Sequence, residues 1–289
     1  EERKDDEEEE EEYTGPTALQ ALRSVVEDGR VRAVAFALQD AEGEVGSYVT
    51  LAEMESLFVS SFIPVPLGDI EWHHSVVFPG DFSSFDDEHL TLMLRAISHE
   101  DAKRAVSAKG GLGTEEVMLV EDSPVFETSA TTVGGRRLSV HDLIKRVLRV
   151  YSDPTVSHVS MGHSIFLVTK SAPLFHQKAM LTPGGTFVCG ASTLERVLTQ
   201  KDVYSNRVLR DGLEASLESM KAQGCRFVVG KGRDKDKKGR EVLDAAVPAL
   251  AQSLRAIFEF VDEDEDQSGK YKEEEEEEEE ERKDDEEEE

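Results

Sequence analysis

The sequence is poor in the residues that build disulfide-bonded or membrane-spanning proteins. Only two of its 289 residues are cysteine, and no apolar run approaches the roughly 18 residues that a membrane helix needs. Cys189 and Cys225 each lie in an apolar run, which predicts two buried thiols and neither a disulfide framework nor a metal site. We therefore expect an intracellular protein of a reducing compartment (cytoplasm, nucleus or mitochondrion) with no membrane partner.

Basic residues are also scarce, with 33 Lys and Arg against 62 Asp and Glu, for a net charge of −29. Residues 1–12 and 261–289 carry −8 and −16 of that charge, which leaves −5 for residues 13–260. Such acidic runs cannot collapse, so we expect disordered tails at 1–12 and 262–289. They are either solubilising linkers or binding arms for a basic protein partner. Direct nucleic-acid binding is not expected, because it needs clustered Lys and Arg.

Between the tails, helical and extended patterns alternate. Residues 13–74 read as a helix and strand extension, with one helix starting at Thr50, whereas the prolines of residues 63–72 indicate a loop. Residues 75–261 form the main domain, in which the expected strands are 75–80, 115–121, 155–160, 164–169, 186–190, 225–230 and 256–261. The expected helices between them include 87–108, one capped by Ser139, 192–198 and 204–224. Short apolar strands alternating with helices predict an α/β fold with a Rossmann-like, doubly wound parallel sheet.

In such folds ligands bind at the carboxyl ends of strands, near the point where the strand order reverses. Two segments follow expected strands with suitable residues. The first is "PGDFSSFDDEH", residues 79–89, and the second is "CGASTLER", residues 189–196. The first segment is the leading candidate for the ligand site, and the second segment ranks after it.

The run "FPGDFSSFDDEHLTLM" resembles the first motif of the cytidylyltransferase-like superfamily, and most closely the adenylyltransferases that act on nicotinate or nicotinamide mononucleotide. That motif is roughly G-x-F-N-P-x-H-x-G-H. The matching positions are Gly80, Phe82 and His89. The departures are Ser83, Ser84, Asp86 and Glu88, in place of Asn, Pro, His and Gly.

The resemblance continues downstream. "KAMLTPGGTFVCGASTLERVL" is similar to a family segment, K-A-x-L-F-P-x-x-x-F-V-x-G-x-D-T, with Ser192 in place of the acidic residue. "MKAQGCRFVVGKGR" resembles a segment that ends in G-G-R, whereas the family's last motif, I-S-S-T-x-x-R, keeps only Ser268. The resemblance implies a nucleotidylyltransferase fold and a catalytic role for His89. The nucleotide-binding residues that it implies are Gly80, Phe82, Ser84, Asp86, His89, Gly190, Ser192 and Arg233.

The family transfers a nucleotidyl group from a nucleoside triphosphate, mainly by positioning it and neutralising its charge. Here Asp86 replaces a donor by an anion. A carboxylate about 4 Å from a phosphate oxygen costs on the order of 4 kcal/mol at an effective dielectric near 20, against roughly 0.3–1 kcal/mol from a helix dipole. We therefore expect Asp86, Asp87 and Ser84 to cap the helix themselves, and the protein to be a pseudoenzyme that serves as a binding or assembly module. His89 is then a solvated first-turn residue.

The alternative is an active transferase that moves AMP or CMP to a phosphate-bearing acceptor. There Asp86 and Glu88 would hold Mg²⁺ against the nucleoside triphosphate, and no other cofactor is expected.

Two further features of the sequence carry less weight. The basic segment 230–240 is either a solvated loop or an anion-binding or tail-binding loop. His73 and His74 have no further ligand at the usual spacing, so we expect no metal there.

Overall fold

In the computed structural model, the main domain and part of the segment before it can be described residue by residue. The described residues are 15–38, 50–83, 85, 87–109, 123–132, 135–153, 156, 164–170, 175–199, 212–230, 238–246 and 251–261. Both acidic tails lie outside these residues. No helix among them is long and apolar enough to cross a membrane.

One sheet organises the described part of the chain, with the strand order β2-β1-β5-β4-β3-β6-β7-β8. The strands are β1 (Ala33–Leu38), β2 (Phe62–Val65), β3 (Ser75–Pro79), β4 (Ser123–Ser129), β5 (Ile165–Thr169), β6 (Thr186–Gly190), β7 (Arg226–Gly230) and β8 (Phe258–Phe260). From β5 to β8 all neighbours are parallel, whereas β1 runs antiparallel to both β5 and β2. The chain winds outward from β3 in both directions, so the expected α/β, Rossmann-like doubly wound fold is confirmed, and its switch point lies between β3 and β6.

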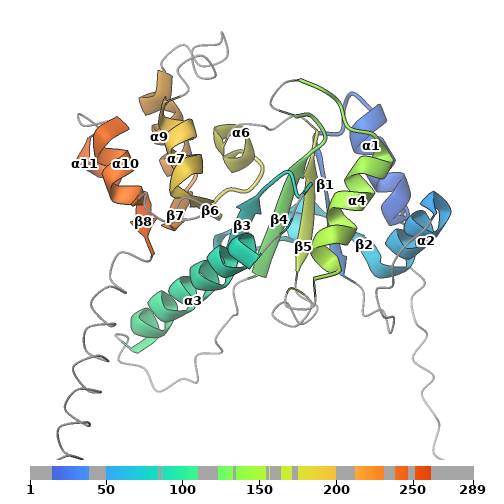
Figure 1. The fold of residues 1–289 in the computed structure, drawn as a ribbon, viewed down its shortest axis with the longest axis horizontal. Helices are drawn as coiled ribbons and strands as arrows, with labels where there is room; N and C mark the ends of the chain where they lie inside the picture. The colour runs from blue at the N-terminus through green and yellow to red at the C-terminus, as the bar shows by residue number, and fades with distance from the viewer. Residues whose placement is uncertain are drawn as a thin grey trace, which may run out of the picture.

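Helices cover both faces of the sheet (Figure 1). On one face lie α1 (Ala18–Glu27), α2 (Leu51–Ser61), α3 (Asp87–Lys109) and α4 (Val140–Tyr151). On the other lie α6 (Phe175–Ala179), α7 (Ala191–Thr199), α9 (Gly212–Ala222), α10 (Gly239–Ala246) and α11 (Gln252–Arg255). Alternate strand residues point into the two layers, as Val76 and Val77 do.

Local sequence explains where three of these helices begin. Thr17, Thr50 and Ser139 each form a capping box with the residue three positions later. Their hydroxyls satisfy backbone N–H groups that have no partner inside a helix. The expected starts at Thr50 and Ser139 are therefore confirmed.

Three expectations about strands need correction. Residues Phe62–Val65 form a strand although Pro64 is among them, because an edge strand needs hydrogen bonds on one side only. The strand beside β3 is Ser123–Ser129, where none was expected, while residues 115–121 lie outside the described part. Of residues 155–160 only Val156 is described, and it is helical rather than extended.

A charge network ties α3 to the far strands of the sheet. Lys103 Nζ donates to both carboxylate oxygens of Glu259, at 2.7 and 2.5 Å, and His99 Nε2 lies 3.1 Å from the same carboxylate. Beneath them, Arg226 pairs with the buried carboxylate of Glu100. Burial opposes ionisation of Glu259, but the hydrogen bonds from Lys103 and His99 outweigh it and hold its pKa below the usual value.

This network predicts an acid-sensitive contribution to stability. A carboxyl whose pKa is lower in the folded than in the unfolded state stabilises the fold above its unfolded pKa, and that stability is lost as the pH falls through the folded pKa. We expect Glu259→Gln to cost about 1.5–3 kcal/mol at pH 7, and to flatten the fall in unfolding free energy below about pH 4. Urea denaturation from pH 7 to pH 3 measures both. An equally steep acid limb in the variant would contradict the assignment.

Candidate functional site

A cavity of about 270 Å³ opens at the switch point of the sheet. One wall comes from the end of β3, the turn after it and the first turns of α3. The other wall comes from the end of β6 and the start of α7. The segments 79–89 and 189–196 thus lie on opposite sides of one cavity, where the carboxyl ends of neighbouring parallel strands meet.

Aromatic side chains form the floor of this cavity, which we call the aromatic chamber. Phe126 of β4 contacts Phe82 and Phe85, with ring centroids 6.0 and 6.4 Å away. The remaining apolar lining is Phe78, Pro79, Leu92, Met93, Val188 and Cys189. Flat apolar walls of this kind suit a planar ring such as a nucleotide base.

Backbone geometry holds Phe82 in the wall. Its φ is +47°, in the left-handed region that side chains other than glycine seldom adopt. Its ring lies over Gly80, where an added Cβ would meet Phe82 Cε1 at 2.7 Å. A side chain at position 80 would therefore displace the Phe82 ring from the chamber wall, and a backbone outlier of this type is often found at functional sites.

The polar groups of the aromatic chamber come from both walls. His89 stacks on Phe85 at 5.9 Å between ring centroids, and Glu88 lines the entrance from the same helix. Ser192 and Gly190 line the opposite wall. Cys189 also reaches this wall, but burial raises the pKa of its thiol to about 12. Because the thiol stays protonated, it is not a nucleophile.

A second cavity of about 440 Å³ adjoins the first and shares Pro79, Thr193 and Arg196 with it. We call it the cationic chamber, because Arg146 of α4 and Arg196 of α7 line it, against the carboxylate of Asp81. Lys178 of α6 also lines it, but its ammonium group is paired with Glu127. Its other polar lining is Ser129, Thr131, Thr132 and Thr193. Guanidinium and hydroxyl groups together form a set that suits a phosphate or carboxylate.

Asp81 is held in place by its own turn. The Ser83 N–H and hydroxyl donate to its carboxylate at 2.9 and 2.8 Å. Burial opposes ionisation of Asp81, but these bonds and the charges of Arg146 and His89 keep its pKa below the usual value. Burial also lowers the pKa of Arg146, although Asp81 opposes that shift. Asp81 therefore offsets part of the positive charge of the chamber.

Behind the cationic chamber lies a buried ion pair. Lys178 pairs with Glu127 of β4, whose side chain is 0% exposed. Thr169 of β5 donates to the other carboxylate oxygen at 2.8 Å. The Gly80 N–H also donates to the Glu127 carbonyl, at 2.9 Å. The turn after β3, strand β4 and helix α6 are thus joined at one residue.

The structure brings several of the implied binding residues together. Phe82, His89, Gly190 and Ser192 line the aromatic chamber, and Gly80 lines the cationic chamber. Ser84, Asp86 and Arg233 lie outside the described residues, as does the side chain of Asp87, so the expected helix cap and the Mg²⁺ alternative remain predictions.

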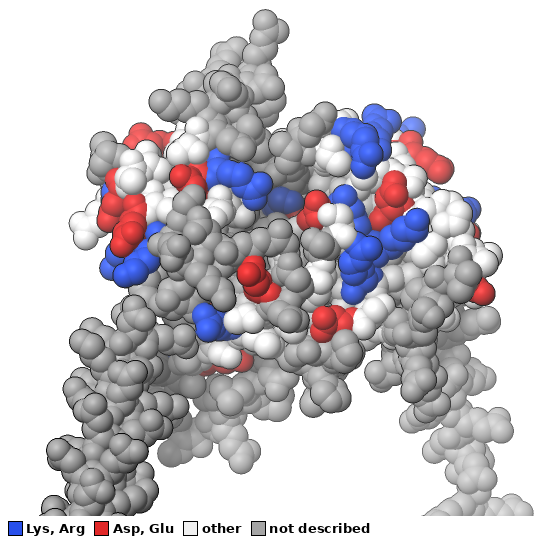
Figure 2. All heavy atoms as spheres, in the orientation of Figure 1, with Lys and Arg blue, Asp and Glu red and all other residues white. Residues whose placement is uncertain are grey.

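Arg146, Lys178 and Arg196 were not predicted to be binding residues. Lys178 and Arg196 lie in segments that the sequence singled out, 178–198 and 189–196, whereas Arg146 lies in α4, in neither of them. Figure 2 shows Lys and Arg side chains gathered over α4, whose exposed basic residues are Lys145 and Arg149.

Comparison with protein families, with curated proteins and with solved structures finds no match to this chain.

Proposed function

We propose that this protein is a nucleotidylyltransferase-like binding module, in which the switch-point site takes a nucleotide without transferring it. The observation that carries the proposal is the pairing of the two chambers. An aromatic floor adjoins a cationic chamber, and Arg196 lines both. A nucleotide has the same division, because a planar base is joined through a sugar to its phosphates.

Two acidic residues that line the chambers favour nucleotide binding over nucleotidyl transfer. Glu88 lines the aromatic chamber and Asp81 lines the cationic one. Each carboxylate repels a long phosphate chain by on the order of 4 kcal/mol at 4 Å and an effective dielectric near 20. A ligand with one phosphate makes fewer such contacts than a triphosphate. We therefore expect mononucleotides to bind at least as tightly as ATP or CTP.

Calorimetric titration of the full chain tests this, with AMP, CMP, nicotinamide mononucleotide, ATP and CTP, each with and without Mg²⁺. The proposal expects magnesium-independent binding of a mononucleotide and no pyrophosphate from the triphosphates. Mg²⁺-dependent ATP or CTP binding with pyrophosphate release would instead establish the active transferase. The absence of binding to all five ligands would overturn both readings.

Two arginines of α4 provide a matched pair of variants. Arg146 faces the cationic chamber, whereas Arg149, one turn later, is exposed. A hydrogen bond to a charged group contributes about 1.5–3 kcal/mol, so we expect Arg146→Ala to weaken mononucleotide binding by about 10- to 100-fold. Arg149→Ala should leave it unchanged. Equal losses of affinity in the two variants would mean that the exposed Lys and Arg side chains over α4, and not the cationic chamber, bind the ligand.

If carboxylates at the start of α3 weaken triphosphate binding, removing them should produce a variant that binds ATP more tightly. Asp86→His with Glu88→Gly removes two carboxylates and restores two of the four positions at which the chain departs from the resembled motif. We expect this double variant to bind ATP more tightly than the wild type, as read from the same titration. An unchanged affinity would count against a preserved nucleotide pocket.

A further inference from the structure

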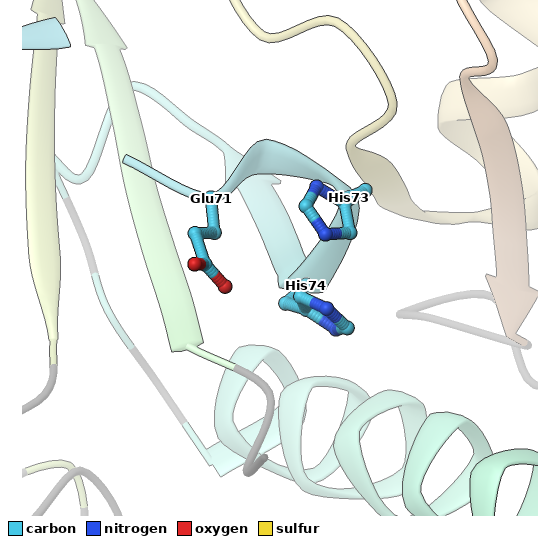
Figure 3. A group of neighbouring side chains, drawn as sticks. All are labelled: Glu71, His73 and His74. Carbon is cyan, nitrogen blue, oxygen red and sulfur yellow. The ribbon is translucent and has the colours of Figure 1, made fainter. Parts of the chain in front are cut away.

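Three side chains with metal-binding atoms meet on the turn before β3, where the sequence spacing of His73 and His74 led us to expect no metal. Glu71, His73 and His74 each offer one ligand atom, and these atoms all lie within 4.8 Å of one another. Figure 3 shows the carboxylate and the two rings projecting from one short turn, with the rings beside each other. The ring centroids are 4.1 Å apart. We propose that this turn binds a zinc ion through Glu71, His73 and His74.

Local structure fixes the turn that carries these ligands. Trp72, between Glu71 and His73, is buried in the core with 7% of its surface exposed. The Glu71 carbonyl accepts from the His74 N–H at 2.9 Å and from the Ser75 hydroxyl at 3.1 Å. The backbone is therefore ordered before a metal arrives, and binding only has to orient side chains.

The ligand chemistry suits zinc. Two imidazoles and one carboxylate are a familiar zinc set, which leaves a fourth position for water. With ligands about 2.0–2.2 Å from the ion, neighbouring donor atoms in a tetrahedron are about 3.4 Å apart. Since the donors lie within 4.8 Å of one another, they have to approach by no more than about 1.4 Å, which the exposed side chains of Glu71 and His73 can do by rotation. Hard cations such as Mg²⁺ prefer oxygen ligands and are not expected.

This site is separate from the proposed nucleotide site. The turn precedes the first residue of β3, whereas both chambers lie at the carboxyl end of that strand, from Phe78 and Pro79 onward. His73 packs instead against the loop that leads into β6, where a Cβ on Gly184 would meet His73 Cβ at 3.2 Å. A zinc ion there would hold the turn at the amino ends of the strands.

A second group of His and Glu side chains provides an internal comparison. His99, Glu100 and Glu259 also bring their ligand atoms within 4.8 Å of one another. Here, however, Lys103 and Arg226 already bind the two carboxylates. A metal would have to displace protein cations, so we expect no zinc at this group, and His99 serves as a control position.

Spectroscopy of the full chain tests the proposal. Metal-free protein is titrated with Co²⁺ in excess Mg²⁺, which occupies the carboxylates of the acidic tails, and then with Zn²⁺ against a chromogenic chelator. We expect one equivalent of metal, with the d–d absorption bands of four-coordinate Co²⁺ that Zn²⁺ abolishes. His73→Ala, His74→Ala and Glu71→Gln should each weaken Zn²⁺ binding at least 10-fold, because loss of even an outer-shell partner costs 10- to 100-fold.

The control is His99→Ala, which should keep the wild-type stoichiometry and affinity. Circular dichroism of each variant confirms that it is folded. The proposal is overturned if His73→Ala binds Zn²⁺ as tightly as the wild type, or if Co²⁺ shows only the weak spectrum of six-coordinate carboxylate binding. Loss of binding in His99→Ala alone would move the site to the second group.

Discussion

Replacing Lys178 by Met is expected to destabilise the protein by about 3–5 kcal/mol, because the change leaves the buried Glu127 carboxylate without its counter-ion. Lys178 and Glu127 pair with side chains 8% and 0% exposed. The variant carboxylate would keep the hydrogen bond from Thr169, at 2.8 Å, which is too little to replace a charge. Urea denaturation at pH 7 measures the loss.

The double variant Lys178→Met with Glu127→Gln separates the pair from its surroundings. Removing both charges of a buried pair is often far less costly than removing one, so the double variant should be more stable than Lys178→Met alone. Lys145→Met removes a lysine from the exposed surface of α4, and should cost less than about 0.5 kcal/mol. If Lys178→Met also cost less than about 0.5 kcal/mol, the buried Glu127 carboxylate would not need Lys178 as its counter-ion.

The same ion pair explains why strand β4 was missed. Its residues include Pro124 and Glu127, two residue types that are depleted in strands. Yet Glu127 is fully buried and bonded to two side chains from α6 and β5. A buried glutamate is tolerated only when its partner is present, and that partner lies 51 residues along the chain. The sequence therefore offers no local sign of the strand.

The doubly wound fold was predictable, because most of its strands, unlike β4, have a clear local signal in the sequence. Strands β6 and β7 are short runs of apolar residues followed by helices, and both run parallel to their neighbours. Every residue in such a strand faces a helix layer, so an uninterrupted apolar run is sufficient evidence. The antiparallel edge was not predictable in this way, because Pro64 in β2 argues against strand pairing until the edge position of β2 is known.

In the candidate site, too, some residues could be predicted from the sequence and others could not. Phe82 and His89 lie in one segment after a predicted strand, and the topology places Gly190 across from them at the switch point. Arg146 and Arg196 belong to helices on opposite faces of the sheet. Their convergence on one cavity depends on the direction in which each side chain leaves its helix. Fold topology fixes which loops meet, whereas packing decides which charges meet.

Phe126→Ala is expected to cost about 3–5 kcal/mol and, in addition, to weaken binding of whichever nucleotide the wild type binds. Phe126 is 1% exposed and its ring contacts four others. These are Phe78, Phe82, Phe85 and Phe166, with centroid distances of 6.0, 6.0, 6.4 and 5.2 Å. Without this ring, Phe82 and Phe85 lose the support that forms the floor of the aromatic chamber.

Phe227→Ala is the matched control, because it removes an equally buried ring from the opposite core layer. Phe227 contacts Phe175, Phe187 and Phe258 at 5.2, 5.9 and 5.0 Å, and it lines neither chamber. Both variants should unfold at lower urea concentration by similar amounts, but only Phe126→Ala should weaken nucleotide binding, measured at a temperature where both remain folded. Equal weakening in the two would show that binding follows global stability, and that the aromatic chamber is not where the base lies.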